Sequence, residues 1–326
     1  MKIYMIGAGA MGGVYGGLLT RAGYDVTLVD IRKDHIDRIR SDGLTVEGVR
    51  GTHVIRLPSQ LGASGLPPAD LAIIFTDANS TTEAARTAKL LLKPDGFALT
   101  LQNGIGNVEA LVAELGKENV IAGVSMNSAA SSGLARSAYT HGGMTSIGEL
   151  DGKDTERIRK VAEMFNKAEI PTEIVADPMS QIWGKFAHNC AVNALAAVSG
   201  LRTGELFRVQ EMNALQEHVI DEILAVVKGK GWKLPEKDPR KKIREHSRMR
   251  YNKPSMLQHM EKGQRTEIDA LNGALVREAR ALGIPVPYNE TIVAFVKGLE
   301  KSRRQALHEA PIDYAAMERA AAEGKQ

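Results

Sequence analysis

The sequence predicts an α/β protein of two domains, with a parallel sheet covered by helices in the first half and an all-helical second half. Three observations support this prediction. A glycine turn separates an apolar strand from a helix close to the N-terminus. Short apolar strands then alternate with helices as far as residue 149, and only helical periodicity follows residue 177. We therefore expect one domain at residues 1–173 and a second at residues 174–326.

The first domain begins with a strand, a turn, a helix and a second strand. Residues 2–6 form the first strand, residues 14–22 the helix, and residues 25–29 the second strand. The pattern then repeats, and such alternation predicts a parallel sheet with helices on both faces. Further strands are expected at residues 71–75, 97–101 and 120–124, further helices at residues 82–92 and 108–115, and edge strands within residues 138–147.

The second domain is expected to consist of long helices, because its apolar residues recur at helical spacing. Ser255 and Thr266 are predicted N-caps, and Thr266 with Asp269 loosely fits a capping box. The expected helices span residues 178–198, 204–230, 240–250, 267–282 and 288–304, with residues 315–326 as a fraying terminal helix.

Composition and charge narrow the class of protein. Of 326 residues, 43% are hydrophobic and 25% charged, as in globular proteins, and no apolar run approaches the roughly 20 residues of a membrane span. The net charge of +3 does not indicate a nucleic-acid partner. The single cysteine, Cys190, excludes an intramolecular disulfide and a cysteine-based metal cage, so no metal site is expected. Because the first strand starts at residue 2, we expect no signal peptide and a cytoplasmic location.

The glycine turn is a predicted dinucleotide-binding site. It reads Gly7-Ala8-Gly9-Ala10-Met11-Gly12 and lies between a strand and a helix, which is the context that this motif requires. Gly7 permits the tight turn, Gly9 lets the backbone approach a pyrophosphate, and Gly12 allows helix and strand to pack closely. The N–H groups and the dipole of the following helix favour the phosphates.

Asp30 ends the second predicted strand, where a carboxylate would bind both hydroxyls of the adenosine ribose and repel a 2'-phosphate. This position favours NAD over NADP. Arg32 and Lys33 follow and could neutralise a phosphate if the loop curled back, so NADP is the alternative. We interpret the two basic residues as solvated charges at the start of the next helix.

Two further patterns indicate a reaction site. Asn103 follows a predicted strand, and open α/β sheets bind ligands at the carboxyl ends of their strands, although an ordinary Asn-Gly turn explains the same residues. Lys185, Asn189 and Asn193 recur at i, i+4 and i+8 and so form a polar stripe on an apolar helix. A lysine in a cleft could protonate an alkoxide as hydride arrives. A satisfied polar seam between helices explains the stripe equally well.

Together these features resemble the ketopantoate reductase family, over almost the whole chain. The resemblance is carried by the glycine turn, by Gln102-Asn103-Gly104, by Gly184-Lys185 with Asn189 and Asn193, and by Ser255-Met256-Leu257-Gln258 followed by residues 266–273. It implies an oxidoreductase that uses NAD(P)H to reduce a 2-keto acid, 2-dehydropantoate, to the 2-hydroxy acid pantoate in pantothenate biosynthesis. It also implies a Rossmann-type first domain and a helical domain like the C-terminal part of 6-phosphogluconate dehydrogenase.

The resemblance also assigns roles to individual residues. Hydride addition creates negative charge on the keto oxygen, where a lysine ammonium would stabilise it. Lys185 would be the general acid, and Glu267 would bind the substrate and orient Lys185. Ser255 would bind the substrate carboxylate, Asn189 and Asn193 would hold Lys185 and substrate hydroxyls, and Asn103 would lie at the nicotinamide end.

Three positions depart from the usual pattern of the family. Thr76-Asp77-Ala78 stands where a lysine is usual, Thr203 where an asparagine is common, and Asp30-Ile31 where an arginine often selects NADP. These departures leave the cofactor and the substrate open. The first alternative is therefore a catabolic NAD-dependent 2-hydroxy acid dehydrogenase with a different substrate.

Two other classes of protein are alternatives. A relative of the 3-hydroxyisobutyrate and 6-phosphogluconate dehydrogenases would join the same two kinds of domain, but the motifs around Ser255 and Glu267 argue against it. A non-catalytic NAD-binding sensor is the alternative outside the enzymes, and intact Lys185 argues against it. Helical domains of this kind often associate through apolar faces, so a homodimer is expected. The expected partner is a small 2-keto or 2-hydroxy acid, with no nucleic acid and no membrane.

Overall fold

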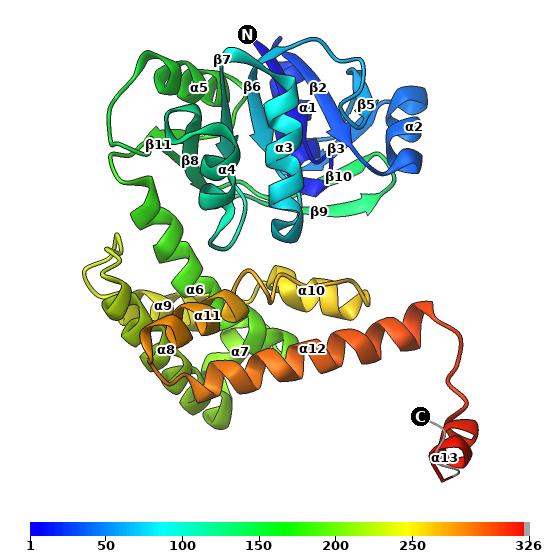
Figure 1. The fold of residues 1–326 in the computed structure, drawn as a ribbon, viewed down its shortest axis with the longest axis vertical. Helices are drawn as coiled ribbons and strands as arrows, with labels where there is room; N and C mark the ends of the chain where they lie inside the picture. The colour runs from blue at the N-terminus through cyan, green and yellow to red at the C-terminus, as the bar shows by residue number, and fades with distance from the viewer. Residues whose placement is uncertain (323–326) are drawn as a thin grey trace. The chain divides into compact units, whose positions relative to one another are not determined.

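The computed structural model describes residues 1–322, which form two compact units. The first comprises residues 1–186 and the short segment Gly231–Lys237, and the second comprises residues 187–230 and the chain from Asp238 onward. Helix α6 (Pro178–Ser199) starts in the first unit and ends in the second. Figure 1 labels the elements. The predicted fold class, an α/β domain followed by an all-helical domain, is confirmed.

The first unit is built on an eight-stranded sheet of order β12-β11-β8-β7-β6-β1-β2-β5. The strands from β5 to β8 in this order are mutually parallel, whereas β11 pairs antiparallel with β8 and parallel with β12. The strand order reverses between β1 and β6, which is where a doubly wound sheet binds ligands. The strands are β1 (Lys2–Ile6), β2 (Asp25–Asp30), β5 (Ser59–Leu61), β6 (Ala69–Ile74), β7 (Leu92–Thr100), β8 (Val120–Ser125), β11 (Thr145–Glu149) and β12 (Thr172–Ile174).

Different helices cover the two faces of this sheet, because successive strand residues point to opposite faces. On one face, Ile3 and Met5 of β1 belong to the core formed with α1 (Ala10–Arg21) and α5 (Glu156–Lys167). On the other face, Tyr4 and Ile6 belong to the core formed with α3 (Thr81–Leu91) and α4 (Asn107–Leu115), which lie in front of the sheet in Figure 1. Burial on both faces explains the continuous apolar runs in the sequence.

A second sheet has the order β4-β3-β10-β9 and packs against α1. A Cβ at Gly17 of α1 would lie 2.7 Å from Val46 in this second sheet, and one at Gly16 would lie 2.7 Å from Leu28 in the main sheet. Helix α1 is therefore in close contact with both sheets. The additional elements are β3 (Leu44–Gly48), β4 (His53–Ile55), β9 (Ser128–Gly133), β10 (Arg136–His141) and the helix α2 (Lys33–Asp42).

Five predicted strands of the first domain are confirmed with shifts of a few residues, as β1, β2, β6, β7 and β8. Helix α1 begins at Ala10, earlier than the predicted start at residue 14. The prediction of edge strands within residues 138–147 is wrong. Both β10 and β11 are interior strands, because β9 and β12 occupy the edges beside them.

The second unit contains only helices among its described residues. Together with the end of α6 they are α7 (Thr203–Arg208), α8 (Gln210–Lys230), α9 (Pro239–Met249), α10 (Ser255–Glu261), α11 (Asn272–Leu282), α12 (Pro287–His308) and α13 (Tyr314–Ala322). The last four residues of the predicted terminal helix lie outside the described part of the chain.

Several predicted boundaries in this unit are wrong for local reasons. The helix predicted at residues 204–230 is two helices, because Val209 is extended and separates α7 from α8. The helix predicted at residues 267–282 begins only at Asn272, because Leu271 has non-helical dihedral angles. Thr266 therefore does not cap it. Ser255 is the first residue of α10, after Pro254, rather than its N-cap.

A buried carboxylate holds the start of α12. Glu222 of α8 is 8% exposed, and its oxygens accept hydrogen bonds from the main-chain N–H groups of Tyr288 (2.9 Å) and Asn289 (2.9 Å) and from the Asn289 amide (2.7 Å). The first N–H groups of a helix have no partner within it and carry positive partial charge. Glu222 satisfies them and so joins α8 to α12.

Replacing Glu222 should weaken the protein more than replacing an exposed glutamate of the same region. Glu222→Ala leaves buried donors without an acceptor, and we expect the free energy of unfolding to fall by about 2–3 kcal/mol. The control is Glu290→Ala, which removes an exposed ion pair with Arg280 and should change it by less than about 1 kcal/mol. Urea denaturation followed by circular dichroism measures both, and equal losses would contradict the role of Glu222.

Candidate active site

The three motif glycines lie in the turn after β1 and in the first turn of α1, and their surroundings differ. Gly7 has φ +95°, and a Cβ there would lie 2.7 Å from the backbone of Phe75. A Cβ at Gly12 would overlap the carbonyl oxygen of Gly7. Gly9, in contrast, has an ordinary φ of −68° and no atom within 4 Å of its Cβ position. Neither backbone conformation nor packing explains Gly9, and the open space beside it suits a ligand.

The turn fits an anionic group such as a pyrophosphate. Among the described residues, no side chain caps the N-terminus of α1, which starts at Ala10. The first N–H groups of a helix have no acceptor within it, and the helix dipole favours negative charge at that end. Together with the open space at Gly9, these groups form a cradle for phosphate oxygens.

The main chain of Ala8 is held on both sides. Its N–H donates to Asp30 Oδ2 at 2.8 Å, and its carbonyl oxygen lies 2.8 Å from Nε2 of His35. The N–H of Ala135 donates to Nδ1 of His35 at 3.3 Å, so Nε2 carries the proton and donates to Ala8. Burial lowers the pKa of His35, which favours this neutral form. His35 therefore supports the glycine turn from α2.

Asp30 lies at the end of β2 as predicted, but its carboxylate is already engaged. Oδ1 accepts hydrogen bonds from the Arg32 main chain (2.9 Å) and from Nε (3.0 Å), and Oδ2 accepts one from the second guanidinium nitrogen (3.0 Å). Burial alone would raise the pKa of Asp30, but the bonds from Arg32 and Ala8 hold it below its ordinary value. Arg32 is exposed at the start of α2, as expected, but its guanidinium also pairs with Asp30; Lys33 is exposed and pairs with Asp37.

The loop after β7 is fixed by a network of amides and hydroxyls. Nε2 of Gln102 donates to the Thr76 carbonyl at 2.9 Å and to Thr81 Oγ1 at 3.0 Å, which joins the ends of β6 and β7. Asn107 donates to the Asn103 carbonyl at 2.9 Å and accepts from Thr81 Oγ1 at 2.7 Å. The main chain of Asn103 is thereby held at the carboxyl end of the sheet, near the strand ends that bind ligands in such folds.

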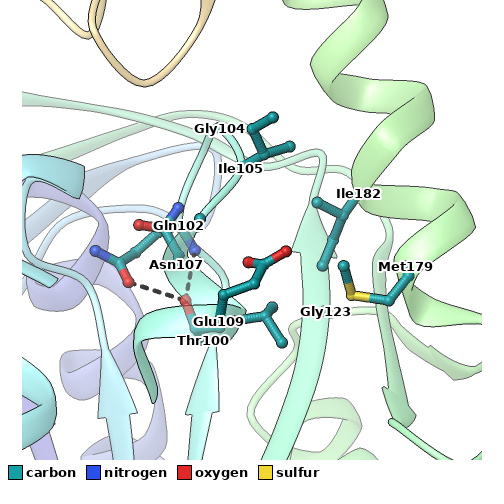
Figure 2. Close-up of a pocket in the computed structure, with 11 residues that line it drawn as sticks. Thr100, Gln102, Gly104, Ile105, Asn107, Glu109, Gly123, Met179 and Ile182 are labelled. Atoms are coloured by element: carbon teal, nitrogen blue, oxygen red, sulfur yellow. Dashed lines mark hydrogen bonds between the residues drawn. The ribbon is translucent and has the colours of Figure 1, made fainter. Parts of the chain in front are cut away.

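A small pocket adjoins this loop. Figure 2 shows Thr100, Gln102 and Glu109 on one side of the pocket, and Met179 and Ile182 of α6 on the other. Polar groups of the end of β7, of the loop after it and of α4 therefore face apolar side chains from the first turns of α6.

The loop after β6 carries a carboxylate where the family resemblance leads one to expect a lysine. Asp77 Oδ1 accepts hydrogen bonds from the main-chain N–H (2.8 Å) and the side-chain amide (2.6 Å) of Asn79. It caps the short 3-10 helix Ala78–Ser80. The carboxylate thus has a local structural role.

Lys185 is half-buried on α6, and its Nζ donates to the main-chain oxygen of Ser125 at 2.5 Å. The segment Gly231–Lys237 lies against the same turn of α6, since a Cβ at Gly184 would lie 2.7 Å from Pro235. Trp183 and Trp232 stack there with ring centroids 5.3 Å apart and an interplanar angle of 14°. The neighbourhood of Lys185 is therefore closely packed.

The other predicted substrate-binding residues belong to the second unit. Asn189 is half-buried on α6 and Asn193, one turn later, is 7% exposed. The hydroxyl of Ser255 donates to Oε2 of Glu267 at 3.2 Å. The structure therefore brings Ser255 and Glu267 together, although twelve positions separate them in the sequence.

Sequence reasoning missed the residues that support the site. His35 and Asn107 are 3% and 4% exposed and are bonded to the turn and the loop described above. A weak signal for His35 exists, because it shares the buried face of α2 with Ile36 and Ile39.

Residues 1–322 contain neither a membrane-spanning helix nor a metal-binding cluster. No helix in that range is long and apolar enough to cross a bilayer. No group of three or more His, Cys, Asp or Glu side chains in that range could hold a metal ion. Cys190 is fully buried, and burial raises the pKa of its thiol well above the ordinary value, which does not suit a nucleophile.

Comparison with known proteins gives a consistent result across both units. Residues 3–152 match the family described as "Ketopantoate reductase PanE/ApbA", and residues 177–300 match "Ketopantoate reductase PanE/ApbA C terminal". The 2-dehydropantoate 2-reductase of Pyrococcus abyssi is 32% identical over 307 residues, which cover 92% of this chain and 98% of that protein.

Solved structures agree with this assignment. A PanE/ApbA family ketopantoate reductase from Ralstonia eutropha JMP134 has a TM-score of 0.86 and 32% identity, covering 93% of this chain and all of the other. A D-mandelate dehydrogenase, solved with NADH and anilino(oxo)acetate, has a TM-score of 0.86 and 25% identity over the same share of each chain. Since family matches cover both units and relatives above 30% identity span nearly the whole chain, the chain belongs to the ketopantoate reductase family and is an oxidoreductase acting on a CH–OH group.

Proposed function

We propose that this chain reduces 2-dehydropantoate, a 2-keto acid, to the 2-hydroxy acid pantoate with a nicotinamide cofactor. The observation that carries the proposal is the match along nearly the full length of proteins named 2-dehydropantoate 2-reductase, including 98% of the Pyrococcus abyssi protein. The open space at Gly9 beside the N-terminus of α1 supports a dinucleotide. The hydrogen bond between Ser255 and Glu267 supports a common site for these two residues, both of which the resemblance assigns to the substrate.

In this proposal the chain's own residues bind the substrate and supply the proton. The cofactor, when bound, supplies the hydride. The ammonium of Lys185 donates a proton to the keto oxygen, where negative charge develops. Glu267 binds the substrate and orients Lys185. Ser255 binds the substrate carboxylate, Asn189 and Asn193 hold Lys185 and the substrate hydroxyls, Asn103 contacts the nicotinamide end, and residues 7–12 hold the pyrophosphate.

A loss of NADH or NADPH absorbance with 2-dehydropantoate tests the proposal. We expect turnover by the wild type and a fall in kcat of about 10²–10⁴-fold for Lys185→Ala, since that variant lacks the proton donor. Lys160→Ala is the control, because Lys160 is exposed and pairs with Glu156 of its own helix. Turnover by Lys185→Ala at the wild-type rate would contradict the assigned role.

The second candidate is an NAD-dependent 2-hydroxy acid dehydrogenase with another substrate. The observation that favours it is the replacement of the expected lysine by Thr76-Asp77, together with Asp30 at the end of β2. A D-mandelate dehydrogenase that was solved with NADH is among the similar structures. A panel of other 2-keto acids, and of 2-hydroxy acids with NAD, separates the two candidates in the same assay.

We propose NAD as the preferred cofactor, with NADP possible, because Asp30 lies where ribose hydroxyls would bind. Arg32 competes for the Asp30 oxygens, and its guanidinium is also a group next to them that attracts a 2'-phosphate. Arg32→Ala should therefore raise the ratio of kcat/KM for NADH over NADPH by about tenfold. Lys33→Ala, at the exposed neighbouring position, should leave the ratio within about twofold. An equal loss with both cofactors in Arg32→Ala would contradict this account.

Substitution by alanine should have different effects at the two motif glycines Gly9 and Gly12. Gly9→Ala places a methyl group in open space, so thermal stability should stay unchanged while the Kd for the cofactor rises about tenfold or more. Gly12→Ala places the methyl group on the Gly7 carbonyl and should lower the melting temperature by several degrees. Thermal melts and cofactor fluorescence titrations measure both. Tight cofactor binding by Gly9→Ala would contradict a pyrophosphate at this position.

We further propose domains at residues 1–173 and 174–326, a homodimer, and a cytoplasmic role in pantothenate biosynthesis. The gap between the two family matches, from residue 152 to residue 177, supports the boundary. Exposed apolar side chains on α12 and α13 support self-association, among them Phe295, Leu307, Tyr314 and Met317.

A further inference from the structure

We propose that a buried cluster of neutral polar side chains around Asn127 positions the ammonium of Lys185, by fixing the main-chain carbonyl of Ser125 to which that ammonium donates. The inference rests on the proposed function, in which Lys185 is the proton donor. Asn127 and Tyr15 are then positioning residues, since they act through the Ser125 peptide.

The contact itself is short and one partner is rigid. Nζ of Lys185 lies 2.5 Å from the Ser125 carbonyl oxygen, and Ser125 is the 2%-exposed last residue of β8. A lysine ammonium is a point charge with three donors on a flexible stem. The direction of a fixed acceptor therefore contributes to where the ammonium lies.

The peptide that carries this carbonyl is held from its opposite side. Its N–H belongs to Met126 and donates to the Met144 carbonyl at 2.9 Å. Because a peptide group is planar, that bond also fixes the direction of the Ser125 carbonyl. A Cβ at Gly143 would lie 2.5 Å from the Met126 carbonyl oxygen, so the turn before β11 packs tightly on the same stretch of chain.

The side chain of Asn127 bonds both to the turn before β11 and to the side chain of Ser125. Its Oδ1 accepts hydrogen bonds from the N–H of Gly143 (2.9 Å) and from the hydroxyl of Tyr139 (2.5 Å). Its Nδ2 lies 2.9 Å from Ser125 Oγ, and its main-chain N–H donates to the same hydroxyl at 3.1 Å. Asn127 therefore holds both the turn that supplies the Met144 acceptor and the side chain of Ser125.

Tyr15 completes the cluster and keeps it neutral. Its hydroxyl lies 2.8 Å from Ser125 Oγ, 2.7 Å from Thr145 Oγ1 and 2.9 Å from Nδ2 of Asn127. Burial raises the pKa of Tyr15 to about 12, so the phenol stays protonated near neutral pH. A satisfied network of neutral dipoles is rigid and adds no charge that would draw the ammonium away. Tyr15 also belongs to α1, so the cluster connects the helix of the cofactor turn to the acceptor of Lys185.

Two measurements test the positioning role in Asn127→Ala and Tyr15→Phe. The first is the rate at which N-acetoxysuccinimide acylates Lys185 at pH 8, measured by mass spectrometry of the peptide that contains Lys185. This rate reports how strongly the ammonium is held. The second is steady-state kinetics, which reports how well the Lys185 ammonium serves as the proton donor. Weakening the carbonyl acceptor favours the free amine, so acylation should be about three- to tenfold faster in Asn127→Ala and about two- to threefold faster in Tyr15→Phe. We expect kcat to fall about tenfold in Asn127→Ala and about threefold in Tyr15→Phe, with KM for the cofactor within about twofold of the wild type in both.

Tyr4→Phe is the matched control. Tyr4 is an equally buried tyrosine, but its hydroxyl donates to the Pro67 carbonyl and it belongs to the core on the other face of the sheet. Its replacement should leave the acylation rate and kcat within about twofold of the wild type. Wild-type acylation and kcat in both test variants, or equal effects of Tyr15→Phe and Tyr4→Phe, would overturn the proposal. If Asn127→Ala does not fold, the comparison of the two tyrosine variants tests the positioning role. If the wild type turns over no 2-keto acid, the proposed function fails, while the acylation rates still decide whether the cluster positions Lys185.

Discussion

The close packing of α1 is the constraint on which the first unit depends. This helix has twelve residues and four of them are glycine, each of which lowers helix stability by about 1 kcal/mol relative to alanine. At every one of these glycines a Cβ would press on a neighbour: the Gly7 carbonyl, Ser137, Leu28 and Val46. The helix exists because tertiary contacts on all sides offset its poor local propensity. Its N-terminus and the turn before it are thereby placed at the reversal of the strand order.

This constraint explains both the successes and the failures of prediction from sequence. Buried parallel strands are apolar on both faces, so β1, β6, β7 and β8 are visible as continuous apolar runs. The start of α1 was predicted too late, because its glycines look like a continuation of the turn. The interior position of β11 was not predictable, since it depends on pairing with β12, a three-residue strand far along the chain. Likewise the end of regular helix before Asn272 depends on one non-helical residue, Leu271.

At the site, too, sequence motifs predicted the positions of residues, whereas packing determines their bonding partners. The positions of Asp30, Asn103 and Lys185 at element ends and on α6 followed from periodicity and family resemblance. Their bonding partners did not, because Arg32, Asn107 and the Ser125 carbonyl are chosen by side-chain and peptide orientation, which no spacing encodes. Asp30 illustrates the difference: its type and place indicated a ribose contact, whereas its charge is balanced within the protein by Arg32.

The stacked indoles next to Lys185 give the molecule an optical property of its own. The chain has two tryptophans, and both belong to this one stack, Trp183 from α6 and Trp232 from the returning segment. Its ultraviolet tryptophan emission therefore originates at a single location, beside the turn of α6 that carries Lys185. Stacked indoles at this separation interact electronically, so the tryptophan bands of the near-ultraviolet circular dichroism carry the signature of one pair. The tryptophan signals of this protein therefore report on the contact between α6 and residues 231–237.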